Sequence, residues 1–63
     1  MDNKLLIGTL LERHRDHLVV AGVTVELPED LPSDQYSVGM SLMVTYTLRG
    51  DKRIVTNIRR STG

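Results

Sequence analysis

The chain has 63 residues, no cysteine and a formal net charge of zero, because eight Lys or Arg residues balance eight Asp or Glu residues. This length allows one small domain, and the missing cysteines exclude a disulfide framework and a thiolate metal site. The balanced charge excludes attraction of nucleic acid by the surface as a whole. The first apolar run, residues 5–7, is too short for a signal peptide or a membrane span, so we expect a cytoplasmic location.

The first predicted strand covers residues 5–11 and is apolar on both faces. Its side chains form two alternating sets, Leu5, Ile7 and Leu11 in one and Leu6 and Leu10 in the other. Such a strand either is covered on both faces, one of them by a second subunit, or bends so that it belongs to two sheets. Gly8 in its middle favours a bend or a close backbone approach. We therefore expect a coiled first strand and a homo-oligomer.

Two short strands follow a polar interruption. Residues 12–17 are all polar and predict a hairpin connection, after which residues 18–21 form a second strand. The third strand, residues 23–27, alternates, which predicts that Val23, Val25 and Leu27 point inward. Between the two, Gly22 supplies the positive φ that a tight hairpin turn needs.

Residues 28–37 form the one irregular segment. Its two prolines and three acidic residues exclude a central strand. Pro32 is suited to begin a single helical turn. We expect Leu31 and Tyr36 to anchor this segment to the core.

The strongest pattern is a hairpin made of residues 38–48 and 54–58 around a charged turn. Period-two alternation places two sets of side chains inward: Leu42, Val44, Tyr46 and Leu48 before the turn, and Ile54, Thr56 and Ile58 after it. The remaining residues, from Arg59 onward, are expected to fray.

Five short strands with an irregular connection between the third and fourth predict an all-β chain. The order is that of the oligonucleotide/oligosaccharide-binding (OB) fold, a small five-stranded β-barrel. An SH3-like or Sm-like barrel is the alternative. We expect one OB-like barrel domain over residues 1–63, with an ordered core of about residues 4–60.

Several short motifs make the chain similar to a known group of proteins. They are Ile7-Gly8-Thr9-Leu10, Gly22-Val23-Thr24-Val25, Val38-Gly39-Met40 with Val44-Thr45-Tyr46, and Ile54-Val55-Thr56-Asn57-Ile58. Taken together they resemble small bacterial OB-type barrel domains of unknown function. The resemblance covers nearly the whole chain and implies a fold, but it carries no catalytic residue across.

Two basic connections are the candidate binding site. In OB barrels the loops between strands one and two and between strands four and five flank the ligand face. Here those loops carry the cationic residues expected to bind a phosphate backbone: Arg13, Arg15, Arg49, Lys52 and Arg53. The leading prediction is therefore a module that binds single-stranded DNA or RNA. Only two aromatic residues, Tyr36 and Tyr46, are available for base stacking.

Other functions are weaker or absent. The alternative is a protein-interaction module, either an adaptor or an inhibitor, acting through a sheet edge or through a dipolar surface, in which the acidic segment of residues 29–34 would matter as much as the basic turns. His14 and His17 have a spacing that a turn could fold round a metal, but no second cluster completes a ligand set, so we predict no metal and no cofactor. No catalytic motif occurs in the sequence, and we do not expect an enzyme.

Overall fold

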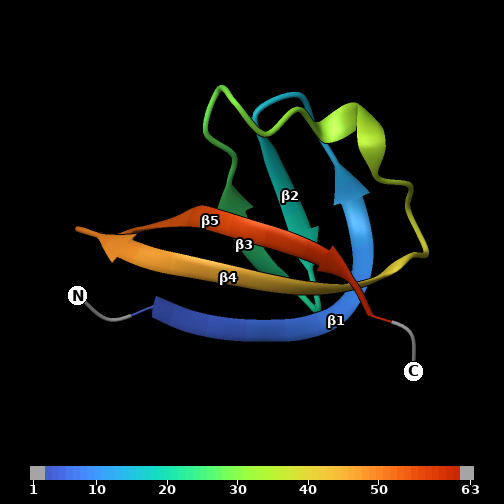
Figure 1. Ribbon diagram of the computed structural model, residues 1–63, viewed down its shortest axis with the longest axis horizontal. Coiled ribbons are helices and arrows are strands. Elements are labelled where there is room, and N and C mark those ends of the chain that lie inside the picture. Colours follow the sequence, from blue (N-terminus) through green and yellow to red (C-terminus); the bar gives the residue numbers. More distant parts are fainter. Residues whose placement is uncertain (1–2, 62–63) are drawn as a thin grey trace.

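The computed structural model describes residues 3–61 as five strands and one short 3₁₀ helix, arranged as Figure 1 shows. The elements are β1 (Asn3–Arg13), β2 (His17–Val20), β3 (Val23–Glu26), η1 (Ser33–Gln35), β4 (Ser41–Arg49) and β5 (Lys52–Arg60). The predicted all-β class is thereby confirmed. Within residues 3–61 no helix has the length and hydrophobicity needed to cross a membrane.

The five strands form one sheet that closes into a ring. The order around the ring is β1-β2-β3-β5-β4, and β4 pairs with β1 to complete it. Neighbouring strands are antiparallel except β3 and β5, which run parallel and pair through Glu26 and Ile54. The irregular segment with η1 crosses one end of this ring (Figure 1).

The expected bend in β1 is confirmed. Its first part, from Asn3 to Thr9, pairs with β4, and its second part, from Leu10 to Arg13, pairs with β2. Gly8 lies at the change of partner, where an added Cβ would stand 2.5 Å from the Cβ of Ala21. Because a Cβ cannot approach another carbon that closely, glycine is what allows β1 to pass the β2–β3 turn.

Both tight hairpin turns have two residues. Gly22 has the predicted positive φ of 81°, and Ala21 before it also has a positive φ, 52°. Two positive φ values in succession define a type I′ turn, whose twist matches that of the flanking strands. In the β4–β5 turn Gly50 has a φ of 62° and Asp51 does not have a positive φ, as in a type II′ turn.

The core is small and aliphatic. Seven side chains are almost completely buried: Leu10, Leu18, Val20, Val25, Leu42, Val44 and Val55. Partly buried residues pack around them, among them Val23, Leu27, Leu31 and Tyr36. The inward face of the third strand and the two anchors of the irregular segment are therefore confirmed.

The predicted inward face of β5 is confirmed for Ile58, which packs against the core, and is wrong for Ile54 and Thr56. Val55 is buried, whereas Thr56 is exposed and Ile54 does not pack against the core. The cause is a register shift, since Thr45 pairs with Asn57 but Tyr46 pairs with Val55. Thr56 is the extra residue, and its hydroxyl donates a hydrogen bond to the carbonyl oxygen of Thr45 at 3.2 Å. A bulge of this kind breaks strict period-two alternation.

Three smaller predictions also need correction. β4 begins at Ser41 and not at residue 38, and Val38 is 62% exposed. Leu48 is 49% exposed near the tip of the β4–β5 hairpin, so it does not extend the core. Arg59 and Arg60 belong to β5 and do not fray, while residues 62 and 63 of the predicted tail lie outside the described part of the chain.

Candidate functional site

Arg13, the first of the predicted site residues, forms a hydrogen bond within the fold. Arg13 is the last residue of β1, and its Nη1 donates a hydrogen bond to the carbonyl oxygen of Tyr36 at 2.9 Å. This bond ties the end of β1 to the end of the irregular segment. A phosphate could therefore recruit Arg13 only in competition with an existing acceptor.

Arg15 lies in the turn between β1 and β2 and is exposed. It lines an open pocket of about 430 Å³ that lies between this turn and the irregular segment. The same pocket is lined by three carboxylates, those of Asp16, Glu29 and Asp34. Arg15 thus stands in an environment with more negative than positive charge.

The other three predicted site residues form a basic tip on the β4–β5 hairpin. Arg49 pairs across the turn with Lys52, and Arg53 pairs with Leu48. All three cationic side chains are exposed, and none of them makes an ion pair among residues 3–61. Three cations on one projecting turn outweigh the single carboxylate of Asp51.

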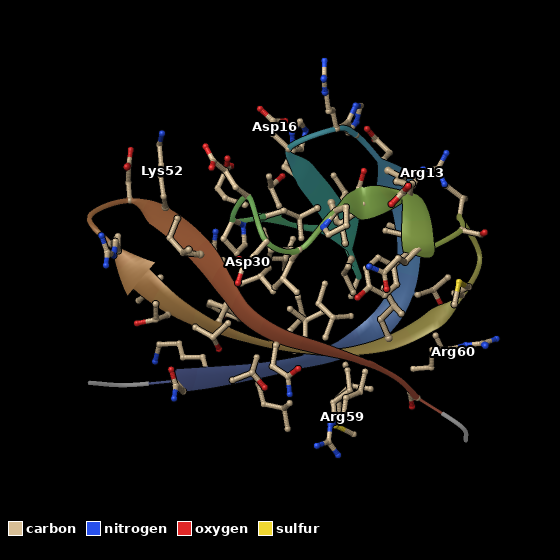
Figure 2. The ribbon with its side chains drawn as sticks, turned by 45° about the horizontal axis from the view of Figure 1, so that its top comes forward. Arg13, Asp16, Asp30, Lys52, Arg59 and Arg60 are labelled. Atoms are coloured by element: carbon tan, nitrogen blue, oxygen red, sulfur yellow. The ribbon has the colours of Figure 1, made fainter. Side chains whose placement is uncertain are left out.

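The two basic loops lie apart. In the view of Figure 2, Lys52 on the hairpin tip lies at the left, whereas Asp16 and Arg13 beside the β1–β2 turn lie at the top centre and the upper right. Arg59 and Arg60 lie at the other end of β5 from Lys52 (Figure 2), about 25 Å away along the strand. The cationic residues near the end of the chain are therefore divided between two regions.

The outer surface of β2 and β3, which lies next to the basic loops, carries acidic and small side chains. Register places His17 beside Glu26, Val19 beside Thr24, and Glu12 of β1 beside Val19. The carboxylates of Glu12 and Glu26 oppose binding of a phosphate backbone here.

Aromatic stacking on that surface is not available either. Tyr36 and Tyr46 pack against the core. The ring of His17 stacks on that of His14, with 4.3 Å between centroids and 15° between planes.

Two carboxylates flank the stacked histidines. Nε2 of His14 lies 2.9 Å from Oε1 of Glu12, and Nδ1 of His17 lies 2.7 Å from Oδ1 of Asp16. The hydrogen bond with His17 holds the pKa of the Asp16 carboxyl below its usual value. Within the described part of the chain no three His, Asp or Glu residues are placed to hold a metal ion.

The pocket beside Arg15 has an apolar floor and an acidic rim. Its apolar lining comes from one end of β3 and from the irregular segment: Leu27, Pro28, Leu31 and Pro32. The rim carries Asp16, Glu29 and Asp34, and Ser33 completes the lining. Three carboxylates against one guanidinium leave the pocket with a net negative charge.

Main-chain hydrogen bonds hold the pocket in shape. The N–H of Leu27 donates to the carbonyl of Asp16 at 2.8 Å, joining the end of β3 to the β1–β2 turn. Within the segment, the N–H of Leu31 donates to the carbonyl of Pro28 at 3.0 Å. The Arg13 bond to Tyr36 holds the far end of the segment, so hydrogen bonds within the chain support both ends of the pocket wall. A pocket fixed in this way loses less conformational entropy on binding.

Sequence reasoning identified the acidic segment and its anchors but not the pocket. The pocket needs the β1–β2 turn and residues 27–34 to meet, and this contact depends on the topology. One sequence signal could have indicated the pocket, namely the mixture of apolar and acidic residues in a segment with two prolines. Anchoring this segment to the core does not by itself require three carboxylates.

No family model, curated protein or solved structure matches this chain.

Proposed function

We propose that this chain is an OB-type β-barrel that serves as a non-enzymatic protein-interaction module. The strand arrangement supports the fold. β1, β2 and β3 are consecutive antiparallel strands, and β4 returns through the longest connection to lie beside β1. This 4-1-2-3 arrangement is a Greek key, and OB domains are five-stranded Greek-key barrels.

The acidic-rimmed pocket is the observation that carries the function. A Lys or Arg side chain combines an apolar stem with a cationic end, and such side chains lay the stem on apolar surface while the charge stays at the rim. Leu27, Leu31 and Pro28 offer that apolar floor, and Glu29 and Asp34 offer the charge. The ligand class is therefore a basic segment of a partner protein.

Protonation supports the same ligand class. Because its bond with His17 lowers the pKa of Asp16, this carboxylate stays ionised to a lower pH than an ordinary aspartate. Asp16 consequently keeps its negative charge at the edge of the pocket to a lower pH than an ordinary aspartate would. Its contribution to the binding of a cationic peptide should be lost only as the pH falls through this lowered pKa.

A peptide-binding assay tests the proposal. We expect a short labelled peptide with a central Lys-Leu-Arg to bind, and the same peptide with Glu in place of both cations not to bind. Glu29→Gln and Asp34→Asn should each weaken binding about two- to fivefold, the effect of one partly exposed charge pair. Fluorescence anisotropy measures these affinities.

Asp51→Asn is the matched control, since Asp51 lies in the β4–β5 turn and outside the pocket. It removes the same charge and should leave peptide affinity unchanged. Equal losses in Asp51→Asn and Asp34→Asn would show a general charge effect and contradict the pocket. Absence of peptide binding by the unaltered chain would also contradict it.

Binding of single-stranded nucleic acid is the second candidate, favoured by the exposed cations of Arg49, Lys52 and Arg53 on the hairpin tip. Three phosphate contacts would give a salt dependence with a slope of about −2 in log affinity against log salt. The same assay with single-stranded DNA at low salt tests it. Lys52→Gln should weaken DNA binding while Arg59→Gln, at the other end of β5, should not.

A further inference from the structure

The first part of β1, residues 3–8, has one hydrogen-bonding edge without a partner strand in residues 3–61. These residues pair with β4. On the other edge the carbonyl oxygen of Thr9 already accepts a hydrogen bond from the N–H of Ala21 at 3.0 Å, and pairing with β2 begins at Leu10. Figure 1 shows this part of β1 along the lower rim of the sheet, with β4 above it and no strand below. An edge of this kind presents backbone N–H and C=O groups that pair readily with another extended chain.

Large apolar side chains accompany this edge. Leu5 is 61% exposed and Ile7 is 55% exposed, both on the outer face of the ring. Across the ladder with β4, Ile7 lies beside Met43. The apolar outer set that the sequence predicted in residues 5–11 is therefore present and has no cover in the described chain.

The usual obstacles to edge pairing are few here. Residues 3–9 contain no proline and pair with β4 in unbroken register, without a bulge. Lys4 is the one charged side chain among them. Natural edge strands generally use prolines, bulges or several charges to prevent pairing.

We propose that two copies of the chain form a two-fold symmetric dimer by antiparallel pairing of their β1 edges, centred on Leu6. In this register Leu5 of one copy lies opposite Ile7 of the other. The two-fold axis repeats this contact, so Ile7 of the first copy lies opposite Leu5 of the second. Lys4 lies opposite Gly8, so neither lysine meets a like charge. An isologous interface uses the same surface on both subunits, and that surface must be complementary to itself under the two-fold axis.

A second copy fits this surface better than an unrelated strand for two reasons. The formal net charge is zero, so two copies have no net repulsion to overcome. A domain of this size also buries only about 60% of the surface of its unfolded chain, so covering Leu5 and Ile7 adds needed stability. None of the residues lining the acidic pocket belongs to residues 3–8, so the dimer does not depend on the proposed function.

Sedimentation equilibrium tests the dimer. We expect a reversible monomer–dimer equilibrium between about 10 and 500 µM. Ile7→Lys should weaken dimerisation about tenfold or more, because the symmetric interface loses two Leu–Ile pairs. Val38→Lys is the matched control, since Val38 is exposed to a similar extent (62%, against 55% for Ile7) but lies outside β1, and it should dimerise like the unaltered chain.

Cysteine crosslinking tests the register, and the chain contains no native cysteine to interfere. An oxidised mixture of Leu5→Cys and Ile7→Cys chains should give more crosslinked dimer than either variant alone. A monomer at every concentration would overturn the proposal and leave this face for another partner. A dimer that survives Ile7→Lys, or crosslinking that ignores the pairing of residues 5 and 7, would overturn it as well.

Discussion

At the scale of single residues, Gly8 has the clearest physical role. The sequence indicated a bend or a close approach in the middle of the first strand, and the structure contains both. What the sequence could not identify is the neighbour, because Ala21 comes near only after β1 has coiled past the β2–β3 turn. Contacts between residues far apart in the chain are not encoded in local periodicity.

We expect Gly8→Ala to destabilise the fold by about 1–3 kcal/mol, the usual cost of forcing an extra carbon into a filled space. Ala21→Gly alone should be nearly neutral, because glycine suits the positive φ of this position and offsets its own entropic cost. The double variant should recover most of the loss, since it moves the methyl group from one side of the contact to the other. Urea unfolding of all four chains measures the coupling, and additive effects would contradict the contact.

Arg13 shows how a residue chosen for its charge can serve the fold. Sequence reasoning grouped it with four other cations as a phosphate ligand. The structure uses its guanidinium to hold the carbonyl of Tyr36, at the end of the segment that forms the pocket. Charge alone does not distinguish a free cation from one that already has an acceptor.

At the scale of elements, β5 shows where pattern reading fails. Strict alternation selected Ile54 and Thr56 for the core, but one extra residue at Thr56 moves Val55 inward. The error has a local cause, because a bulge shifts all positions beyond it by one. Alternation in β3, which contains no bulge, was predicted correctly.

Substitutions at Val55 and at its neighbour Ile54 test the register of β5 across the bulge. Val55→Ala should cost about 2 kcal/mol or more, from the lost burial and the cavity that remains. Ile54→Ala removes more carbon but should cost less than about 1 kcal/mol, because Ile54 lies outside the core. Chemical denaturation of both variants measures this, and the reverse order would show that the register across the bulge is wrong.

At the scale of the whole molecule, the strand order and the class of fold were predictable because turn residues divide the chain into short alternating runs. The position of the insertion between the third and fourth strands also followed from its prolines. The pocket and the separation of the two basic loops were not predictable, because both depend on how the ring closes. Both features favour a basic protein segment over a phosphate backbone as the ligand.

The parallel contact between β3 and β5 has a consequence for the order of folding. Glu26 and Ile54 are 28 positions apart in the chain (54 minus 26), whereas β2–β3 and β4–β5 are joined by two-residue turns. Bringing distant segments together costs more chain entropy than closing a hairpin. The contact between β3 and β5 is the seam of the ring, and it has one residue pair to offset that cost. We therefore expect the hairpins to form first and the seam to close last.

The same reasoning makes the seam the first place to open in the native state. Amides in β3 should exchange with solvent deuterium faster than those in the middle of β4, because β4 pairs extensively with both β1 and β5, whereas β3 pairs with β5 only through Glu26 and Ile54. Equal protection in both strands would mean that the ring opens only as a unit. The sheet of this protein closes into a ring through one weak contact, that between β3 and β5. We expect the formation of this contact to be both the slowest step of folding and the step that reverses most easily.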